Sequence, residues 1–184
     1  IPNLTPVEGE SGLLENLKIG LKQLDPDKPA LIVTGDVPLL TCEAIRDLLA
    51  QAKERPAEIY YPVVPKETCE SKFPGIKRTY MTISDGTLTG GNIVLAKPSA
   101  LFACGGLLEQ AIATRKKPWM MANVLGIWLI LKFLVKRLSV RDVERRLEAL
   151  TGVQAMGVIS DYAEIAFDVD KPRDLELAQA ILKR

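Results

Sequence analysis

Three aspartates carry the clearest chemistry in this sequence, because each stands where a predicted strand ends. Asp36 follows the apolar run at 31–33, and Asp168 and Asp170 lie near the other end of the chain. Open α/β sheets bind ligands outside the carboxyl ends of their strands. Magnesium takes oxygen ligands, often from one or two carboxylates together with substrate phosphates. These residues therefore indicate a magnesium site for phosphoryl transfer, provided that the two strand ends meet, which spacing alone does not show.

Each aspartate also has a purely structural interpretation. Asp36 lies in a Gly-Asp turn, and both residue types favour turns for backbone reasons. Asp170 stands just before Pro172, where a capping or turn residue is expected. The period-two pattern of residues 165–170 predicts a strand on which Asp168 and Asp170 share one face, and an acidic residue on an exposed strand face needs no function.

Two further polar residues could contact a ligand. Asn92 follows Gly90 and Gly91 inside a strand pattern, where paired glycines indicate a bulge or a close approach. Its side chain could bond a sugar or base, or could simply occupy the bulge. Lys132 lies within an apolar helical pattern, where it is either a surface residue with a buried stem or a phosphate partner.

Composition limits the classes of function. The chain has 184 residues, of which 47% are hydrophobic and 26% charged, and this predicts one globular domain over residues 1–184. A net charge of +1 gives no electrostatic reason to expect nucleic acid or an acidic membrane as a partner. Histidine is absent, which excludes Ser-His or Cys-His machinery within this chain. The three cysteines form no metal-binding or disulfide pattern, so we expect a cytoplasmic protein.

Strand and helix patterns alternate along the chain. This alternation predicts an α/β fold with a largely parallel sheet, and Asp85-Gly86 predicts a β-hairpin within residues 79–96. Residues 65–78 read as a loop. The expected helices lie at 13–24, from Thr41 to Pro56, at 101–114 as one kinked or two separate pieces, at 119–135, from the Ser139 capping box to Gly152, and after Lys171.

The most apolar segment of the chain is 119–135. It is short for a membrane span and contains Asn123 and Lys132. We therefore expect a buried or partner-facing helix and no membrane partner. If this helix is exposed, it could join copies of the chain into a homo-oligomer.

Three motifs in this order resemble nucleotidyltransferases of the molybdenum-cofactor guanylyltransferase and sugar-nucleotide pyrophosphorylase type. The motifs are Leu31-Ile32-Val33-Thr34-Gly35-Asp36-Val37-Pro38, Gly90-Gly91-Asn92-Ile93 and Asp168-Val169-Asp170-Lys171-Pro172-Arg173-Asp174-Leu175-Glu176. The resemblance implies a Rossmann-like three-layer sandwich. It also implies Mg²⁺-dependent transfer of a nucleoside monophosphate from a nucleoside triphosphate to a small, phosphorylated acceptor, with release of pyrophosphate.

The same resemblance implies roles for individual residues. Asp36 and Asp170 would be the metal carboxylates. Gly91 and Asn92 would line the acceptor side of the cleft, and Thr34 and Gly35 its nucleotide side.

One expected motif of these enzymes has no match here. It is the Gly-rich loop after the first strand, whose amides and following basic side chains hold the triphosphate. We therefore expect that loop to precede Ile1 in a complete domain, and this chain by itself to be a poor catalyst. Two alternatives stay open: a glycosyltransferase that uses Asp168-Val169-Asp170 as its Asp-x-Asp motif, and a non-catalytic binding or assembly domain.

Overall fold

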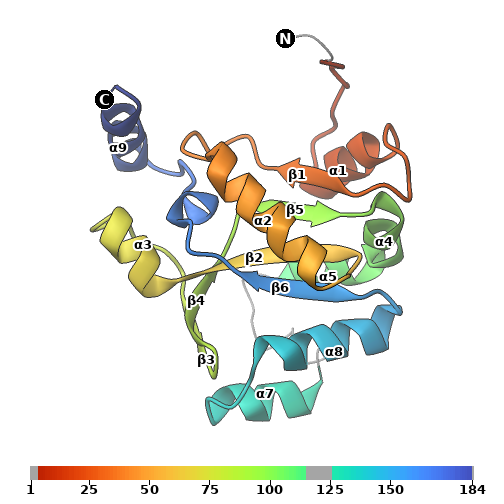
Figure 1. The fold of residues 1–184 in the computed structure, drawn as a ribbon. Helices are drawn as coiled ribbons and strands as arrows, with labels where there is room; N and C mark the ends of the chain where they lie inside the picture. Colours follow the sequence, from red (N-terminus) through yellow and green to blue (C-terminus); the bar gives the residue numbers. More distant parts are fainter. Residues whose placement is uncertain (1–3, 115–125, 184) are drawn as a thin grey trace.

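A six-stranded sheet lies at the centre of the computed structural model, which describes residues 4–114 and 126–183 (Figure 1). The strands are β1 (Ala30–Val33), β2 (Ile59–Pro65), β3 (Met81–Ile83), β4 (Gly86–Gly90), β5 (Ile93–Ala96) and β6 (Ala155–Ile159). The helices are α1 (Leu13–Leu21), α2 (Cys42–Glu54), α3 (Lys66–Lys72), α4 (Pro98–Ala103), α5 (Gly105–Thr114), α7 (Ile127–Leu134), α8 (Val140–Thr151), the 3-10 helix η2 (Ala163–Ala166) and α9 (Pro172–Leu182).

The α/β class and the hairpin are confirmed, but the prediction of a mostly parallel sheet is wrong. Within the described residues, β2 pairs with β6 in parallel, whereas β1–β5, β2–β5, β2–β4 and β3–β4 are antiparallel. The strands β1, β2 and β6 do run in one direction. The antiparallel strand β5 lies between β1 and β2, however, and keeps these two from pairing with each other.

Helices cover both faces of this sheet, as the alternation of side chains along β5 shows. Ile93 and Leu95 belong to the larger core, which the helices α2 and α3 complete. Val94 and Ala96 point to the opposite face, where they pack with side chains from α1, α4 and α5. In Figure 1, α2 crosses in front of the sheet and α5 lies behind it.

Two predictions near the site are corrected. Residues 65–78, predicted to be a loop, contain α3, which buries Cys69 and packs Phe73 into the larger core. Residues 165–170, predicted to be a strand, instead complete η2 and continue as an irregular segment. Period-two spacing failed here because Ile165, Ala166 and Phe167 are all completely buried, so buried and exposed residues do not alternate over these three positions.

Helix boundaries follow the capping residues of the sequence. Thr41 Oγ1 accepts a hydrogen bond from Ala44 N at 3.3 Å and begins α2. Ser139 and Asp142 form the predicted capping box of α8, which ends at Gly152 with φ of 71°. Of the apolar run at 119–135, residues 119–125 lie outside the described part. No helix among the described residues has both the length and the apolar character needed to cross a membrane.

Candidate active site

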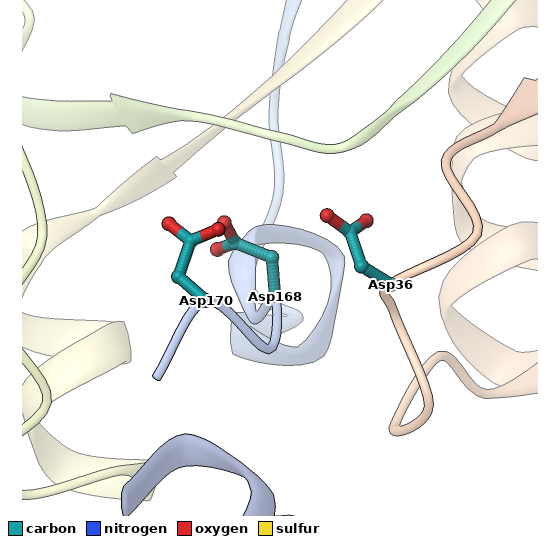
Figure 2. A group of neighbouring side chains, drawn as sticks. All are labelled: Asp36, Asp168 and Asp170. Atoms are coloured by element: carbon teal, nitrogen blue, oxygen red, sulfur yellow. The ribbon is translucent and has the colours of Figure 1, made fainter. Parts of the chain in front are cut away.

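The three aspartates singled out in the sequence come together in space. Asp36, Asp168 and Asp170 each offer a carboxylate oxygen, and these oxygens all lie within 4.8 Å of one another. Figure 2 shows the carboxylates pointing to the same side, Asp36 from the loop after β1 and the other two from the segment after η2. Asp36 and Asp170 are exposed and Asp168 is half-buried, so a ligand can reach the group.

Backbone hydrogen bonds hold these two segments side by side. Val169 N donates to the carbonyl oxygen of Asp36 at 3.0 Å. Thr34 N donates to Asn92 O at 3.2 Å, and Asn92 N donates to Ile165 O at 2.9 Å. The turn after β1, the break between β4 and β5, and η2 are thus joined in one network.

Gly91 is needed for this network because a side chain would not fit there. A Cβ atom at this position would lie 2.6 Å from Ile165 Cγ2 and 3.1 Å from Pro62 O. Gly91 N also donates to Pro62 O at 2.9 Å. The glycine therefore marks a close approach of two backbones, one of the two interpretations that the sequence allows.

The larger core anchors η2 just before Asp168. The ring of Phe167 is completely buried and lies 4.8 Å from the ring of Phe73, centroid to centroid. The carboxylate of Glu164 is also buried, and it accepts hydrogen bonds from Thr41 Oγ1 at 3.1 Å and Lys72 Nζ at 2.8 Å. The segment that carries two of the site carboxylates is therefore fixed to α2 and α3.

Asp174 fixes the backbone at Asp170. Its Oδ2 accepts hydrogen bonds from Asp170 N at 3.2 Å and from Lys171 N at 2.9 Å. The second bond belongs to the cap of α9, whose first residue is Pro172. The start of this helix thus orients the loop that presents Asp170, a positioning role that the sequence motif did not reveal.

Basic side chains border the carboxylates. Arg78 Nη2 donates to Asp168 Oδ1 at 2.8 Å, and the two side chains are only 12% and 23% exposed. A hollow of about 420 Å³ opens beside this pair. It is lined by Lys77, Arg78, Thr79, Thr89, Asp168, Asp170 and Lys171. Arg173 joins Lys77, Arg78 and Lys171 in an adjoining hollow. Cations and anions thus meet in one concave surface, as an anionic substrate bound with a metal would require.

The carboxylate group fits a magnesium ion in chemistry and closely in size. Magnesium prefers oxygen ligands at about 2.1 Å, so two oxygens on one ion lie at most about 4.2 Å apart. The oxygens here reach 4.8 Å, and small rotations of the exposed Asp36 and Asp170 side chains would bring them within range. Arg78 donates a hydrogen bond to one carboxylate oxygen of Asp168, which leaves the other oxygen as a ligand for a metal ion.

The remaining predicted site residues divide into those at the site and one elsewhere. Thr34, Gly91 and Asn92 join the backbone network, and Gly35 lies between Thr34 and Asp36. Asn92 Nδ2 is buried and has no hydrogen-bond partner among the described residues, so it is a donor that these residues leave unsatisfied.

Lys132 is the residue that the structure places elsewhere. Its Nζ lies 2.6 Å from Asp142 Oδ1, which joins α7 to α8. The described side chains that line the hollows beside the carboxylates do not include it. We therefore leave Lys132 out of the proposed site.

The buried cysteines offer no nucleophile. Burial raises the pKa of the Cys69 thiol, and the charge of Arg78 opposes this shift only in part. Burial likewise raises the pKa of the Cys104 thiol. Because the thiolate is the reactive form, the chemistry of the site falls to the carboxylates and the basic groups.

Several solved structures resemble this one, and three of them illustrate the range of similarity. A hypothetical transferase from Thermus thermophilus is 39% identical, with a TM-score of 0.82 over 95% of this chain and 76% of that chain. The 2-C-methyl-D-erythritol 4-phosphate cytidylyltransferase of Francisella tularensis is 13% identical, with a TM-score of 0.51 over 94% of this chain and 69% of its own. The 4-diphosphocytidyl-2C-methyl-D-erythritol synthase of Anaerococcus prevotii is 14% identical, with a TM-score of 0.54 over 97% of this chain and 69% of its own. The last two show a shared fold alone.

Comparison with curated proteins finds no match. A family model, however, assigns the chain directly. The model of the MobA-like NTP transferase domain matches residues 2–158. This range includes Asp36 and Asn92 but ends before Asp168, whereas the match to the Thermus transferase covers 95% of the chain. The resemblance seen in the three sequence motifs is thereby confirmed, and the chain belongs to the family of MobA-like NTP transferase domains.

Proposed function

We propose that this chain carries the metal and acceptor half of a Mg²⁺-dependent nucleotidyltransferase site. The reaction transfers a nucleoside monophosphate from a nucleoside triphosphate to a small, phosphorylated acceptor. The observation that carries the proposal is the convergence of Asp36, Asp168 and Asp170 in a chain of this family. Asp36 and Asp170 hold the metal, and Asp168 completes the group.

The transfer exchanges one phosphorus–oxygen bond for another. An acceptor oxygen forms a bond to the α-phosphorus of the triphosphate while the bond from that phosphorus to the β-phosphate oxygen breaks, and pyrophosphate leaves. When bound, Mg²⁺ neutralises charge on the transferring group and aligns the attacking oxygen. The hydrogen-bond network through Thr34, Asn92 and Ile165 holds the loop of Asp36 beside the segment that carries the other two aspartates.

The basic hollow supports a phosphorylated acceptor. Lys77, Arg78 and Lys171 line the same surface as Asp168 and Asp170, so a phosphate on the acceptor can pair with lysine while its reacting oxygen faces the metal. The free Nδ2 of Asn92 adds a donor for a hydroxyl or carbonyl oxygen. In this proposal Gly91 and Asn92 form the acceptor side, and Thr34 and Gly35 the nucleotide side.

Release of pyrophosphate from each of the nucleoside triphosphates, with and without Mg²⁺, tests the reaction. We expect slow release, because no match to the triphosphate-binding loop is present, and we expect it to depend on Mg²⁺, to be enhanced by small phosphorylated acceptors and to be abolished by a chelator. Nucleotide sugars offered in parallel test the alternative, because a glycosyltransferase would use those donors and release no pyrophosphate. Activity with nucleotide sugars alone would contradict the proposal.

Matched variants separate the metal site from general effects of charge. Asp36→Asn and Asp170→Asn should each lower the rate of release on the order of a hundredfold, since the metal supplies several kcal/mol of charge stabilisation. Asp161→Asn removes an exposed carboxylate from the loop before η2 and should leave the rate unchanged. Equal losses in all three variants would remove the carboxylate group from the mechanism.

A further inference from the structure

An exposed apolar face runs along α7, away from the candidate active site. Ile127, Trp128, Leu131, Leu134 and Val135 recur at the spacing of one helix face, and they are between 44% and 75% exposed. No residue of this helix is buried in the described structure. Figure 1 shows α7 at the end of the molecule opposite α9, beside α8. Such a continuous apolar face is typical of a surface that another partner covers.

Positive charge adjoins this face in the sequence. Between Gly126 and Arg146 the sequence has six basic side chains and only Asp142 and Glu144 as acidic ones. Both of these acids are engaged in ion pairs, with Lys132 and Arg55 respectively. Lys136 and Arg137 are exposed immediately after the helix. The whole chain carries only +1, so this excess is a local property.

We propose that α7 docks this protein on an anionic lipid surface, with the helix lying in the plane of the interface. A tryptophan and aliphatic residues on one face, with lysine and arginine beside them, are the features of helices that bind at membrane surfaces without crossing them. The expectation of no membrane partner considered only spanning and net charge, and neither argument applies to an interfacial helix.

Charge also favours a lipid surface over a second copy of the chain. In a two-fold dimer through α7 the same basic side chains would gather from both copies around the axis, and their repulsion would oppose the contact. An anionic lipid surface instead attracts every one of them. An apolar groove of about 350 Å³ lies between the hairpin and α8, and Leu138, which follows α7 in the chain, lines it together with Met81 and Ile83.

Co-sedimentation with vesicles tests the docking. The full chain is mixed with vesicles of phosphatidylcholine alone or of phosphatidylcholine with phosphatidylglycerol. We expect binding to the vesicles that contain phosphatidylglycerol and weakening as salt rises, because salt screens the charges. The double variant Trp128→Ser with Leu134→Ser should lower the partition coefficient about tenfold or more. The double variant Lys136→Glu with Arg137→Glu should lower it by a similar factor.

Control variants and the oligomeric state decide among the outcomes. Leu13→Ser and Leu182→Ser replace leucines that are 66% and 63% exposed on α1 and α9, and should leave vesicle binding unchanged. Equal loss in these controls, or no binding to either vesicle, overturns the proposal. Sedimentation equilibrium that shows a dimer broken by the Trp128 and Leu134 substitutions assigns the face to a second copy and also overturns it. Pyrophosphate release in solution should be unaffected by all of these variants, so failure here is distinct from failure of the proposed function.

Discussion

The two faces of the sheet differ in how completely they are packed. On the face of α2 and α3, side chains such as Leu48, Val64 and Phe167 are at most 1% exposed. On the opposite face, α7 buries none of its residues, and a groove of about 350 Å³ remains between the hairpin and α8. The packed face holds the segment that ends in Asp168 and Asp170. Rigid packing thus supports the carboxylates, whereas the part of the opposite face between the hairpin and α8 stays open.

Neighbouring valines on β2 test this difference directly. Val64 points into the larger core and is completely buried, whereas Val63 points to the other face and lines the groove. Val64→Ala should lower the free energy of unfolding by about 2–3 kcal/mol, because it removes two buried methyl groups and leaves a cavity. Val63→Ala should cost under about 1 kcal/mol, because its surroundings are already open. Urea titration measures both, and equal losses would mean that the two faces are packed alike.

Substitution of Arg78 tests whether its ion pair with Asp168 affects metal binding or only the stability of the fold. Arg78→Met frees Asp168 and should raise the Mg²⁺ concentration for half-maximal pyrophosphate release about tenfold, as the loss of a residue that orients a ligand does. Arg78→Lys, which keeps the charge without the planar fork, should show a smaller shift. Arg46→Met removes an exposed arginine on α2 and serves as the control. If Arg78→Met lowers thermal stability but leaves the Mg²⁺ dependence as it is, Arg78 is structural only.

The smallest effect is expected at the ion pair between α7 and α8. The hydrogen bond from Lys132 lowers the pKa of the Asp142 carboxyl, with help from the backbone of Ser139. A lowered folded pKa stabilises the protein above the unfolded value of about 3.9, and this contribution is lost as the pH falls through the folded pKa. Lys132→Met should therefore cost no more than about 1 kcal/mol at neutral pH, and the difference from the unsubstituted protein should shrink below about pH 4.

Thermal unfolding at several pH values measures this difference, with Lys22→Met as a control at an exposed lysine on α1. If the loss of stability in Lys132→Met is the same in acid as at neutral pH, Asp142 is not the partner through which Lys132 acts. A large loss of stability in this variant at neutral pH would instead mean that α7 is packed more firmly than its exposed residues indicate.

Local signals in the sequence predicted much of the fold. The caps at Thr41 and Ser139, the Asp85-Gly86 hairpin and the start of α9 at Pro172 depend on neighbouring residues alone, and each is confirmed. The sheet was predicted less well because pairing depends on distant residues. Strand β5 enters between β1 and β2, and nothing near either strand signals that insertion.

The candidate site shows the same limit. The sequence identified the three aspartates by type and position, but that their segments meet is shown by long-range contacts such as the bond from Val169 N to Asp36 O. Residues 165–170 were predicted as a strand because their residue types alternate with period two, but Ile165, Ala166 and Phe167 are all buried and form no exposed face. Asp174 and Arg78 act through hydrogen bonds to Asp170 N and Asp168 Oδ1, contacts that only the folded structure reveals.

Binding of Mn²⁺ as a stand-in for Mg²⁺ tests the central claim most directly, because it requires no substrate. Electron paramagnetic resonance of the full chain should show a bound Mn²⁺ that Mg²⁺ displaces. Asp36→Asn and Asp170→Asn should each weaken this binding about tenfold or more, since each removes a charged oxygen ligand. Asp161→Asn should leave it unchanged. Binding that is as tight in Asp36→Asn as in the unsubstituted protein would contradict the assignment of these carboxylates as the metal site.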